Sequence, residues 1–244
     1  METHNLRVGH KIKDMATQFS NEALKFLRGL KKNNDREWFG ERKEVYEKQL
    51  KEPMLALIGE VNEAMAEFSP EHLRPANKIL MRIYRDIRFS KDKRPYKHHV
   101  SAWWAREGLQ KTSGGGFYLQ VSSTDVLIAA GVYMPEREQL LAIRRYLVDH
   151  HLEFRKIMAG KKLRSLMQET DTLSLTRPPK GFAADDPAID LVMCKQWGLQ
   201  ATLPVERATS PGLLKDVVER FRVAAPLIRL LNTPLIAKPK RPMF

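Results

Sequence analysis

The sequence contains a single cysteine, Cys194, and has no long run of apolar residues. One cysteine cannot form an internal disulfide or a thiolate metal cluster, which fits a reducing compartment. No apolar run is long enough to span a bilayer, so no membrane partner is expected. Residues 1–15 contain charges and histidines but lack the apolar segment of a secretory signal. We therefore expect a cytoplasmic protein.

Several motifs that would identify a function are also missing. The glycines at 114–116 are not followed by the Lys-Ser or Lys-Thr pair of a P-loop, and no cofactor is expected. His98-His99 and His150-His151 are adjacent pairs whose side chains point apart on a strand or a helix, so we expect no metal site. There is no zinc-ligand spacing, helix-turn-helix pattern or aromatic RNA-recognition motif, so specific reading of bases is not indicated.

Positive charge is in large excess, with a formal net charge of +13 at pH 7, and it is unevenly distributed. Residues 70–99 contain nine Lys or Arg against three Asp or Glu, and residues 207–244 contain eight against two. Residues 136–168 add a smaller excess, whereas residues 1–69 are balanced. Basic blocks that converge in the fold would form a positive surface that attracts phosphate-rich partners, including nucleic acid.

The most basic segment runs from Arg82 to His99, where seven Lys or Arg accompany only two carboxylates. From Ile79 to Phe89 apolar residues alternate with polar ones, which predicts a half-buried strand. Pro95 lacks a backbone donor, so residues 90–99 are predicted to form a loop. On the predicted strand four side chains point the same way, namely Arg82, Tyr84, Asp86 and Arg88.

This set of side chains suits an anionic ligand. Arginine is suited to bidentate binding of phosphate or carboxylate. An aspartate between two arginines has its ionised form favoured, so Asp86 is interpreted as orienting the guanidinium groups before it is considered as an acid. Asp86 and Asp92 are nevertheless the candidates for a catalytic carboxylate. The residues predicted to bind the ligand are Arg82, Tyr84, Arg88, Lys93, Tyr96, Lys97, Tyr118 and Gln120.

The remaining patterns predict an α+β fold, with a mainly antiparallel central sheet flanked by N-terminal, middle and C-terminal helices. Ser20 and the pair Asn34 and Glu37 resemble helix starts, and Pro53 suits a first helical position. Long helices are predicted at 136–158 and 211–231.

Two strands, 117–121 and 126–133, are predicted to form a hairpin, and 197–203 is predicted to be an edge strand. If the hairpin pairs with the strand around Ile83, then Tyr118 and Gln120 join the arginines in one polar floor.

The expected organisation is an N-terminal extension at 1–18, a single α+β domain at 19–233, and a basic, proline-rich tail at 234–244. The sequence gives no indication of the oligomeric state.

Several motifs occur in a fixed order along the chain. They are F-L-R-G-L-K-K-N-N-D-R-E-W-F at 26–39, R-I-Y-R-D-I-R-F-S-K-D-K-R-P-Y-K at 82–97, G-F-Y-L-Q-V, A-G-V-Y-M-P, and P-K-G-F with the D-D-P that follows. In these motifs the chain resembles the uncharacterised family designated domain of unknown function 2461, over roughly residues 19–203. The resemblance implies an α+β domain and an intracellular protein, and it implies no reaction.

Three functions are compatible with these residues. In the first, Arg82 and Arg88 bind a small phosphorylated or carboxylated ligand while Lys93 and Lys97 close over it. Whether such a site is catalytic stays open, because the sequence places no clear nucleophile or base beside it. In the second, the basic blocks contact the phosphates of nucleic acid, and exposed aromatic residues such as Tyr96 stack on its bases. In the third, the arginines, aspartates and tyrosines form an internal ion-pair core with no ligand.

Overall fold

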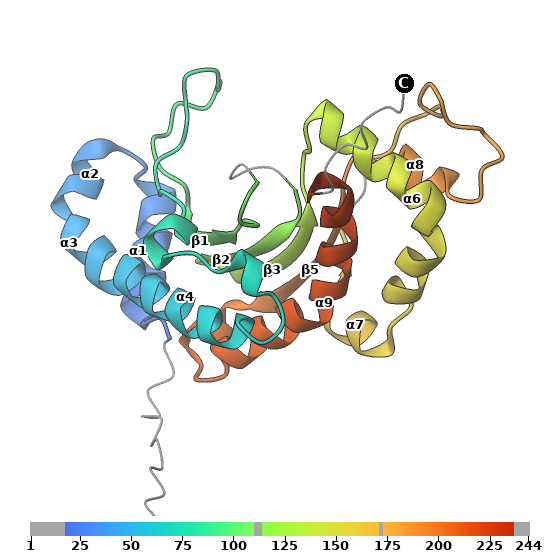
Figure 1. The fold of residues 1–244 in the computed structure, drawn as a ribbon. Helices are drawn as coiled ribbons and strands as arrows, with labels where there is room; N and C mark the ends of the chain where they lie inside the picture. The colour runs from blue at the N-terminus through green and yellow to red at the C-terminus, as the bar shows by residue number, and fades with distance from the viewer. Residues whose placement is uncertain (1–17, 110–113, 171–172, 237–244) are drawn as a thin grey trace, which may run out of the picture.

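The structure is a computed structural model that describes residues 18–109, 114–170 and 173–236 (Figure 1). It contains a five-stranded antiparallel sheet together with several helices, which confirms the predicted α+β class. Almost all of the predicted extension at 1–18 lies outside the described residues, as does most of the predicted tail at 234–244. The last described helix continues through Pro234 to Ile236.

The N-terminal helices begin close to the predicted positions. Ser20 caps the first helix, because its hydroxyl accepts a hydrogen bond from the Ala23 amide at 3.1 Å. The cap of the second helix is Asp35 instead of Asn34, since Asp35 Oδ1 accepts a hydrogen bond from the Trp38 amide at 2.8 Å. The elements in this region are α1 (Asn21–Lys32), α2 (Arg36–Glu41), α3 (Lys43–Tyr46), the π-helix η1 (Glu47–Lys51) and α4 (Glu52–Met65).

The predicted hairpin at 117–121 and 126–133 is confirmed, and it forms the middle of the sheet. The strands lie in the order β1-β2-β3-β5-β4. Their bounds are β1 (His99–Trp104), β2 (Gly116–Ser122), β3 (Asp125–Val132), β4 (Gln168–Glu169) and β5 (Trp197–Pro204). The prediction of an edge strand at 197–203 is wrong, because β5 pairs with β3 on one side and with the short β4 on the other.

The predicted strand from Ile79 to Phe89 is also wrong. Ile79 ends the short helix α5 (Ala76–Ile79), and the following residues make only isolated bridges, at Leu80 with Ala102 and at Tyr84 with Tyr96. The place beside the hairpin is taken by β1, which pairs with β2 along its whole length. The alternation of apolar residues therefore reflects partial burial near the base of a loop, and Phe89 at its far end is 95 % exposed.

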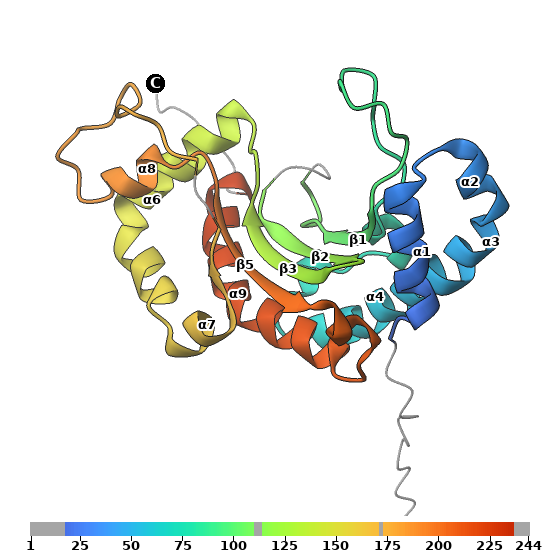
Figure 2. The same cartoon turned by 180° about the vertical axis from the view of Figure 1, so that it is seen from behind.

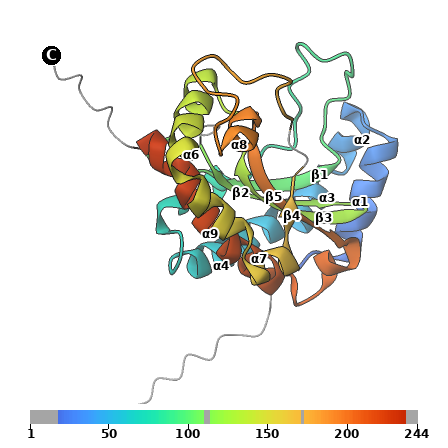
Figure 3. The same ribbon diagram turned by 90° about the vertical axis from the view of Figure 1, so that its right-hand side faces the viewer.

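Helices cover one face of the sheet. Figures 1 and 2 show α4 and α9 (Leu213–Ile236) against that face, and Figure 3 shows α6 (Arg137–Met158) outside α9, against which it packs. Phe221 of α9 illustrates the core, because its ring lies 5.2 Å from Trp104 and 4.9 Å from Phe117 between centroids. The smaller elements are η2 (Pro70–His72), α7 (Lys161–Leu166), α8 (Ile189–Met193) and η3 (Val205–Thr209).

No helix among the described residues lies across the opposite face of the sheet (Figures 1 and 2). The register places Ser101 beside Gln120 and Trp103 beside Tyr118 on this face. None of the described helices is both long enough and apolar enough to cross a membrane.

Candidate anion-binding site

Residues 81–98 form a projecting loop that we call the arm. It leaves the sheet beside β1 and rises well beyond it before it returns (Figures 1 and 2). The two limbs are tied together near their base, where the Lys97 amide donates to the Ile83 carbonyl at 2.8 Å and the Arg85 amide donates to the Pro95 carbonyl at 2.8 Å. The arm is therefore a hydrogen-bonded loop with a paired base and an exposed end.

Tyr96 and α2 anchor the base of the arm. The Asn34 side chain donates to the Tyr96 carbonyl at 3.0 Å and accepts from the Tyr96 amide at 3.0 Å. The Tyr96 ring is 4 % exposed and stacks on the Phe39 ring, with the centroids 4.1 Å apart. Tyr96, which the sequence predicted as a ligand contact, is placed in the core by the structure.

Asp86 holds one arginine pair near the end of the arm. The Arg88 guanidinium donates to both Asp86 oxygens, at 3.0 and 2.8 Å. These hydrogen bonds, with a further contribution from the charge of Arg82, lower the pKa of Asp86 to about 2. Arg88 and Asp86 thus lie in contact on a loop and not on the predicted strand. Asp86 is a carboxylate acceptor at neutral pH and has no proton to donate.

Asp92 holds a second pair. Arg94 Nη2 and Arg85 Nη1 each lie 2.7 Å from Asp92 Oδ2, and Arg94 Nε also donates to Asp92. Hydrogen bonds from Arg94 and then Arg85 lower the pKa of Asp92, so this group is also ionised at neutral pH. Neither catalytic candidate is arranged as a general acid.

The cations of the arm outnumber these two carboxylates. Arg82, Lys91 and Lys93 are exposed, and the Arg88 side chain is 76 % exposed even within its pair. The Lys93 ammonium group donates to the Ile87 carbonyl at 3.0 Å, which uses one of its three donors. Lys97 lies at the half-buried base of the arm. The arm presents a net positive surface that is solvated on its sides.

An aromatic ring stands at the end of the arm. Phe89 is 95 % exposed, and the Arg88 guanidinium carbon lies 5.8 Å from its ring centroid. Single exposed apolar residues are common, but a phenylalanine beside a guanidinium group offers two planar surfaces for stacking. Tyr84, on one limb, is 50 % exposed.

Residues 1–69 have no net charge, yet α1 adds positive charge near the base of the arm. Burial lowers the pKa of His98 at the base of the arm, and the positive charges of Arg94, Lys31 and Arg85 lower it further. Lys31 of α1 is thus one of the cations that act on the base of the arm. The charge sum over residues 1–69 hid the cations of α1, because acidic residues elsewhere in that block cancel them. The helical spacing of Lys25, Arg28 and Lys32 places these three on one face of α1 and would have revealed a local positive surface.

The polar floor predicted to join Tyr118 and Gln120 with the arginines does not form as one surface, because its members lie partly on the sheet and partly on the arm. Because the hairpin pairs with β1, Tyr118 and Gln120 share a sheet face with Ser101 and not with the arginines of the arm. The Tyr118 hydroxyl donates to Gln120 Oε1 at 2.9 Å, and burial raises the pKa of Tyr118. These side chains form a small uncharged polar group on the uncovered face.

His99 lies on that same face, opposite Ser122 in the register. Burial, followed by the positive charges of Lys97 and His98, lowers the pKa of His99 to about 4. Its imidazole is neutral at pH 7. Within the described residues, no three His, Cys, Asp or Glu side chains are grouped closely enough to hold a metal ion.

Comparison with known proteins gives a match to a protein family. The family model described as "Conserved hypothetical protein (DUF2461)" matches residues 22–229. No curated protein and no solved structure matches the chain. The family match covers the arm, the sheet and most of α9; it begins three residues after the range 19–203 over which the motifs suggested a resemblance and continues 26 residues beyond its end.

Proposed function

The chain belongs to the DUF2461 family, and we propose that it binds nucleic acid, with the arm as its main contact to phosphate groups. The observation that supports this most strongly is the composition of the arm. Seven Lys or Arg face two aspartates, both of which are already held by arginines, and Phe89 stands 95 % exposed at the end. Basic side chains with an exposed aromatic are the usual elements of contact with a nucleic-acid strand.

The shape of the arm favours a polymer over a small ligand. Sites for small molecules enclose most of the ligand in a concave pocket. The arm projects from the body, and its cations are exposed along both limbs, so a small anion there would stay largely in water. A strand of phosphates can instead contact several cations in succession, and each contact releases counterions.

A small anion near the uncovered sheet face is the second candidate. Ser101, Tyr118 and Gln120 lie together there, and Lys97 is close enough to lower the pKa of His99. These groups offer hydrogen bonds and one nearby cation to a phosphate or carboxylate. The candidate has fewer positive charges than the arm, and it does not use Arg82 or Arg88.

An ion-pair scaffold accounts for the arm less well. The pairs of Asp86 with Arg88 and of Asp92 with Arg94 lie at the surface, where screening by water leaves such pairs with little net stabilisation. Surface pairs of this strength explain the local shape of the loop, but they leave Arg82 and Lys91 without a role.

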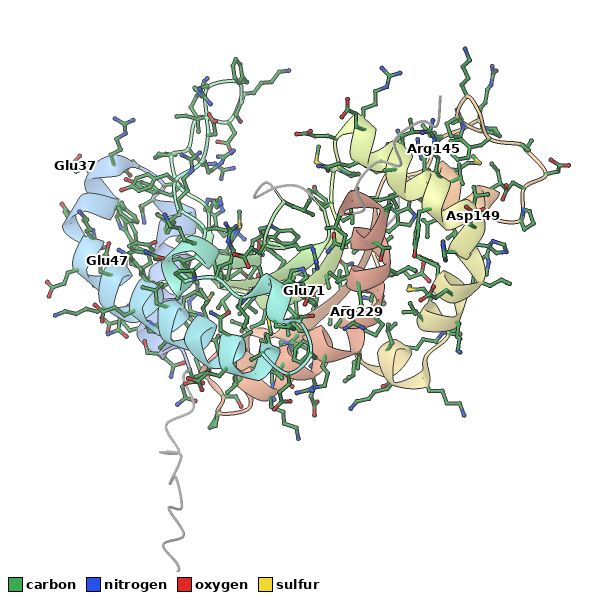
Figure 4. The ribbon with its side chains drawn as sticks, viewed as in Figure 1. Glu37, Glu47, Glu71, Arg145, Asp149 and Arg229 are labelled. Atoms are coloured by element: carbon green, nitrogen blue, oxygen red, sulfur yellow. The ribbon has the colours of Figure 1, made fainter. Side chains whose placement is uncertain are left out.

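The experiment measures binding of a fluorescently labelled 20-nucleotide single strand by polarisation. The test variant is Arg82→Gln with Lys91→Gln, which removes two exposed cations of the arm and spares its hydrogen-bonded base. The control is Lys156→Gln with Lys161→Gln, which removes two exposed cations on α6 and α7. Figure 4 shows how far this region lies from the arm, with Arg145 and Asp149 on α6 at one end and Glu37 on α2 at the other.

We expect the arm variant to bind about tenfold more weakly at 100 mM salt and the control to change less than twofold. Equal losses in the two variants, or no binding by the parent protein, would contradict the proposal. A thermal shift with inorganic phosphate that is lost in Gln120→Leu and unaffected in the arm variant would favour the second candidate.

A further inference from the structure

A groove lies between α1 and the α2–α3 segment, next to the base of the arm. Its volume is about 890 Å³, which is in the size range of small-ligand sites. Its lining residues come from α1, from Asn33 directly after it, and from Trp38, Arg42 and Val45 on the other side. None of the predicted site residues lies among them.

Trp38 lines the groove, and its ring packs against α1. Its amide donates to Asp35 Oδ1 at 2.8 Å, and its ring lies 5.4 Å from the Phe26 ring between centroids. A Cβ on Gly29 would stand only 2.6 Å from Trp38 Cζ2, so the ring can lie against α1 only because residue 29 is a glycine. The indole is therefore half-buried and fixed against α1, where it lines the groove.

The rim of the groove is cationic. Lys25, Arg28 and Lys32 come from α1 and Arg42 from the other wall, whereas Glu22 is the one carboxylate among the lining residues. The Arg42 guanidinium carbon lies 4.6 Å from the centre of the Trp38 ring, while Arg42 Nη1 also pairs with Glu41 at 2.7 Å and the side chain stays 41 % exposed. The planar guanidinium group of Arg42 thus already stacks on the indole. A further flat ring can stack on the face of the guanidinium group that points away from Trp38.

We propose that this groove takes an unpaired base of single-stranded nucleic acid, with the strand's phosphates on the cationic rim. The inference rests on the proposed function and specifies its ligand. An aromatic ring within a positive rim matches the two parts of a nucleotide, because every base has a face that stacks on aromatic rings and guanidinium groups. In a duplex the base faces are already stacked on one another, so the groove selects a single strand.

The groove and the arm are adjacent on the molecule. Phe39 follows Trp38 on α2 and stacks on Tyr96 at the base of the arm, and Asn34, which follows the lining residue Asn33, makes two hydrogen bonds with the Tyr96 backbone. A strand that leaves the groove can reach the arm, where Phe89 offers a second exposed ring. Two separated aromatic contacts on one positive surface fit a flexible strand better than a rigid duplex.

The first test compares three labelled 20-nucleotide ligands by polarisation at one salt concentration. They are a single strand, its duplex, and a strand of equal length in which every nucleotide is abasic. We expect the single strand to bind at least tenfold more tightly than either of the others. Equal binding of the abasic strand or the duplex would overturn the inference but leave the proposed function intact. Failure of all three ligands to bind would overturn both.

The second test uses Trp38→Leu, which keeps an apolar side chain in the groove but removes the ring. We expect single-strand affinity to fall about tenfold and duplex affinity to change less than twofold. Equal loss for both ligands would contradict a stacking role. Lys25→Gln with Arg28→Gln, both exposed on α1, tests the rim in a variant that leaves Trp38 intact. This variant should weaken single-strand binding more than Lys156→Gln with Lys161→Gln does, and an equal effect would count against the rim.

Discussion

The Tyr96 ring lies on the Phe39 ring with a centroid distance of 4.1 Å and an interplanar angle of 14°. This contact fixes the base of the arm to α2, and Tyr84 packs beside both rings, at 6.2 Å from Phe39 and 5.3 Å from Tyr96 between centroids. The arm is therefore built on the aromatic core of the N-terminal helices, although its far end is exposed.

Phe39→Ala should lower the free energy of unfolding by about 3 kcal/mol, because it removes a buried ring and leaves a cavity between α2 and the arm. Urea denaturation with circular dichroism measures this loss. Phe89→Ala is the matched control, and it should change stability by less than about 0.5 kcal/mol since Phe89 is 95 % exposed. Similar losses in the two variants would mean that the end of the arm is packed in solution.

Asn34→Ala should increase hydrogen exchange within the arm, because it removes both hydrogen bonds to the Tyr96 backbone. Asp35→Ala is its neighbour in sequence but acts elsewhere, through loss of the α2 cap at a cost of about 1 kcal/mol. Hydrogen exchange followed by mass spectrometry separates the two effects. Faster exchange in the arm of Asp35→Ala, with no change in Asn34→Ala, would show that the arm is held in another way.

Gly29→Ala and Gly40→Ala should have opposite effects on stability. The new methyl group at residue 29 would lie 2.6 Å from the Trp38 ring and displace it, which should cost about 1–3 kcal/mol. The methyl group at residue 40 meets nothing within 4 Å, and alanine in a helix should stabilise the protein by about 0.5–1 kcal/mol. Thermal denaturation gives both signs, and destabilisation by Gly40→Ala would contradict the placement of α2.

His99 should make the protein less stable in acid. Its pKa is lowered to about 4, first by burial and then by the charge of Lys97, so the unfolded chain takes up the proton more readily. The contribution of His99 to stability is therefore complete above about pH 6.5 and is lost as the pH falls towards 4. Partial exposure limits the total loss to roughly 2 kcal/mol.

The measurement is urea denaturation at pH 7 and pH 4.5. Between these two pH values, the His99→Gln variant should lose less stability than the parent protein. The control substitution is His151→Gln on α6. If the parent and His99→Gln lost equal stability, the imidazole would not be held in its neutral form.

Much of the fold could be predicted from local signals. The caps, Pro53 in the first turn of α4 and the apolar spacing predicted the helices, because these features act within one or two turns. The hairpin was predicted because its two strands and its turn are contiguous in sequence. Both kinds of element depend on neighbours along the chain.

The errors concern contacts between distant segments. The apolar residues from Ile79 to Ile87 alternate, but whether such a segment joins a sheet depends on which strand occupies the adjacent edge, and β1 occupies it here. Because β1 and not the predicted strand pairs with the hairpin, Tyr118 and Gln120 are separated from Arg82 and Arg88. The composition of the site was visible in the sequence, whereas its division between an arm and a sheet face was not.

The salt dependence of single-strand binding tests the central claim most directly. Affinity of the labelled strand is measured from 50 to 300 mM salt for the parent, for Arg82→Gln with Lys91→Gln, and for Lys156→Gln with Lys161→Gln. Each phosphate contact contributes about 0.7 to the slope of log affinity against log salt for a single strand. We predict that the arm variant lowers the magnitude of the slope by about 1.4 and that the control leaves it unchanged. Equal slopes in all three proteins, or no binding by the parent, would contradict the account.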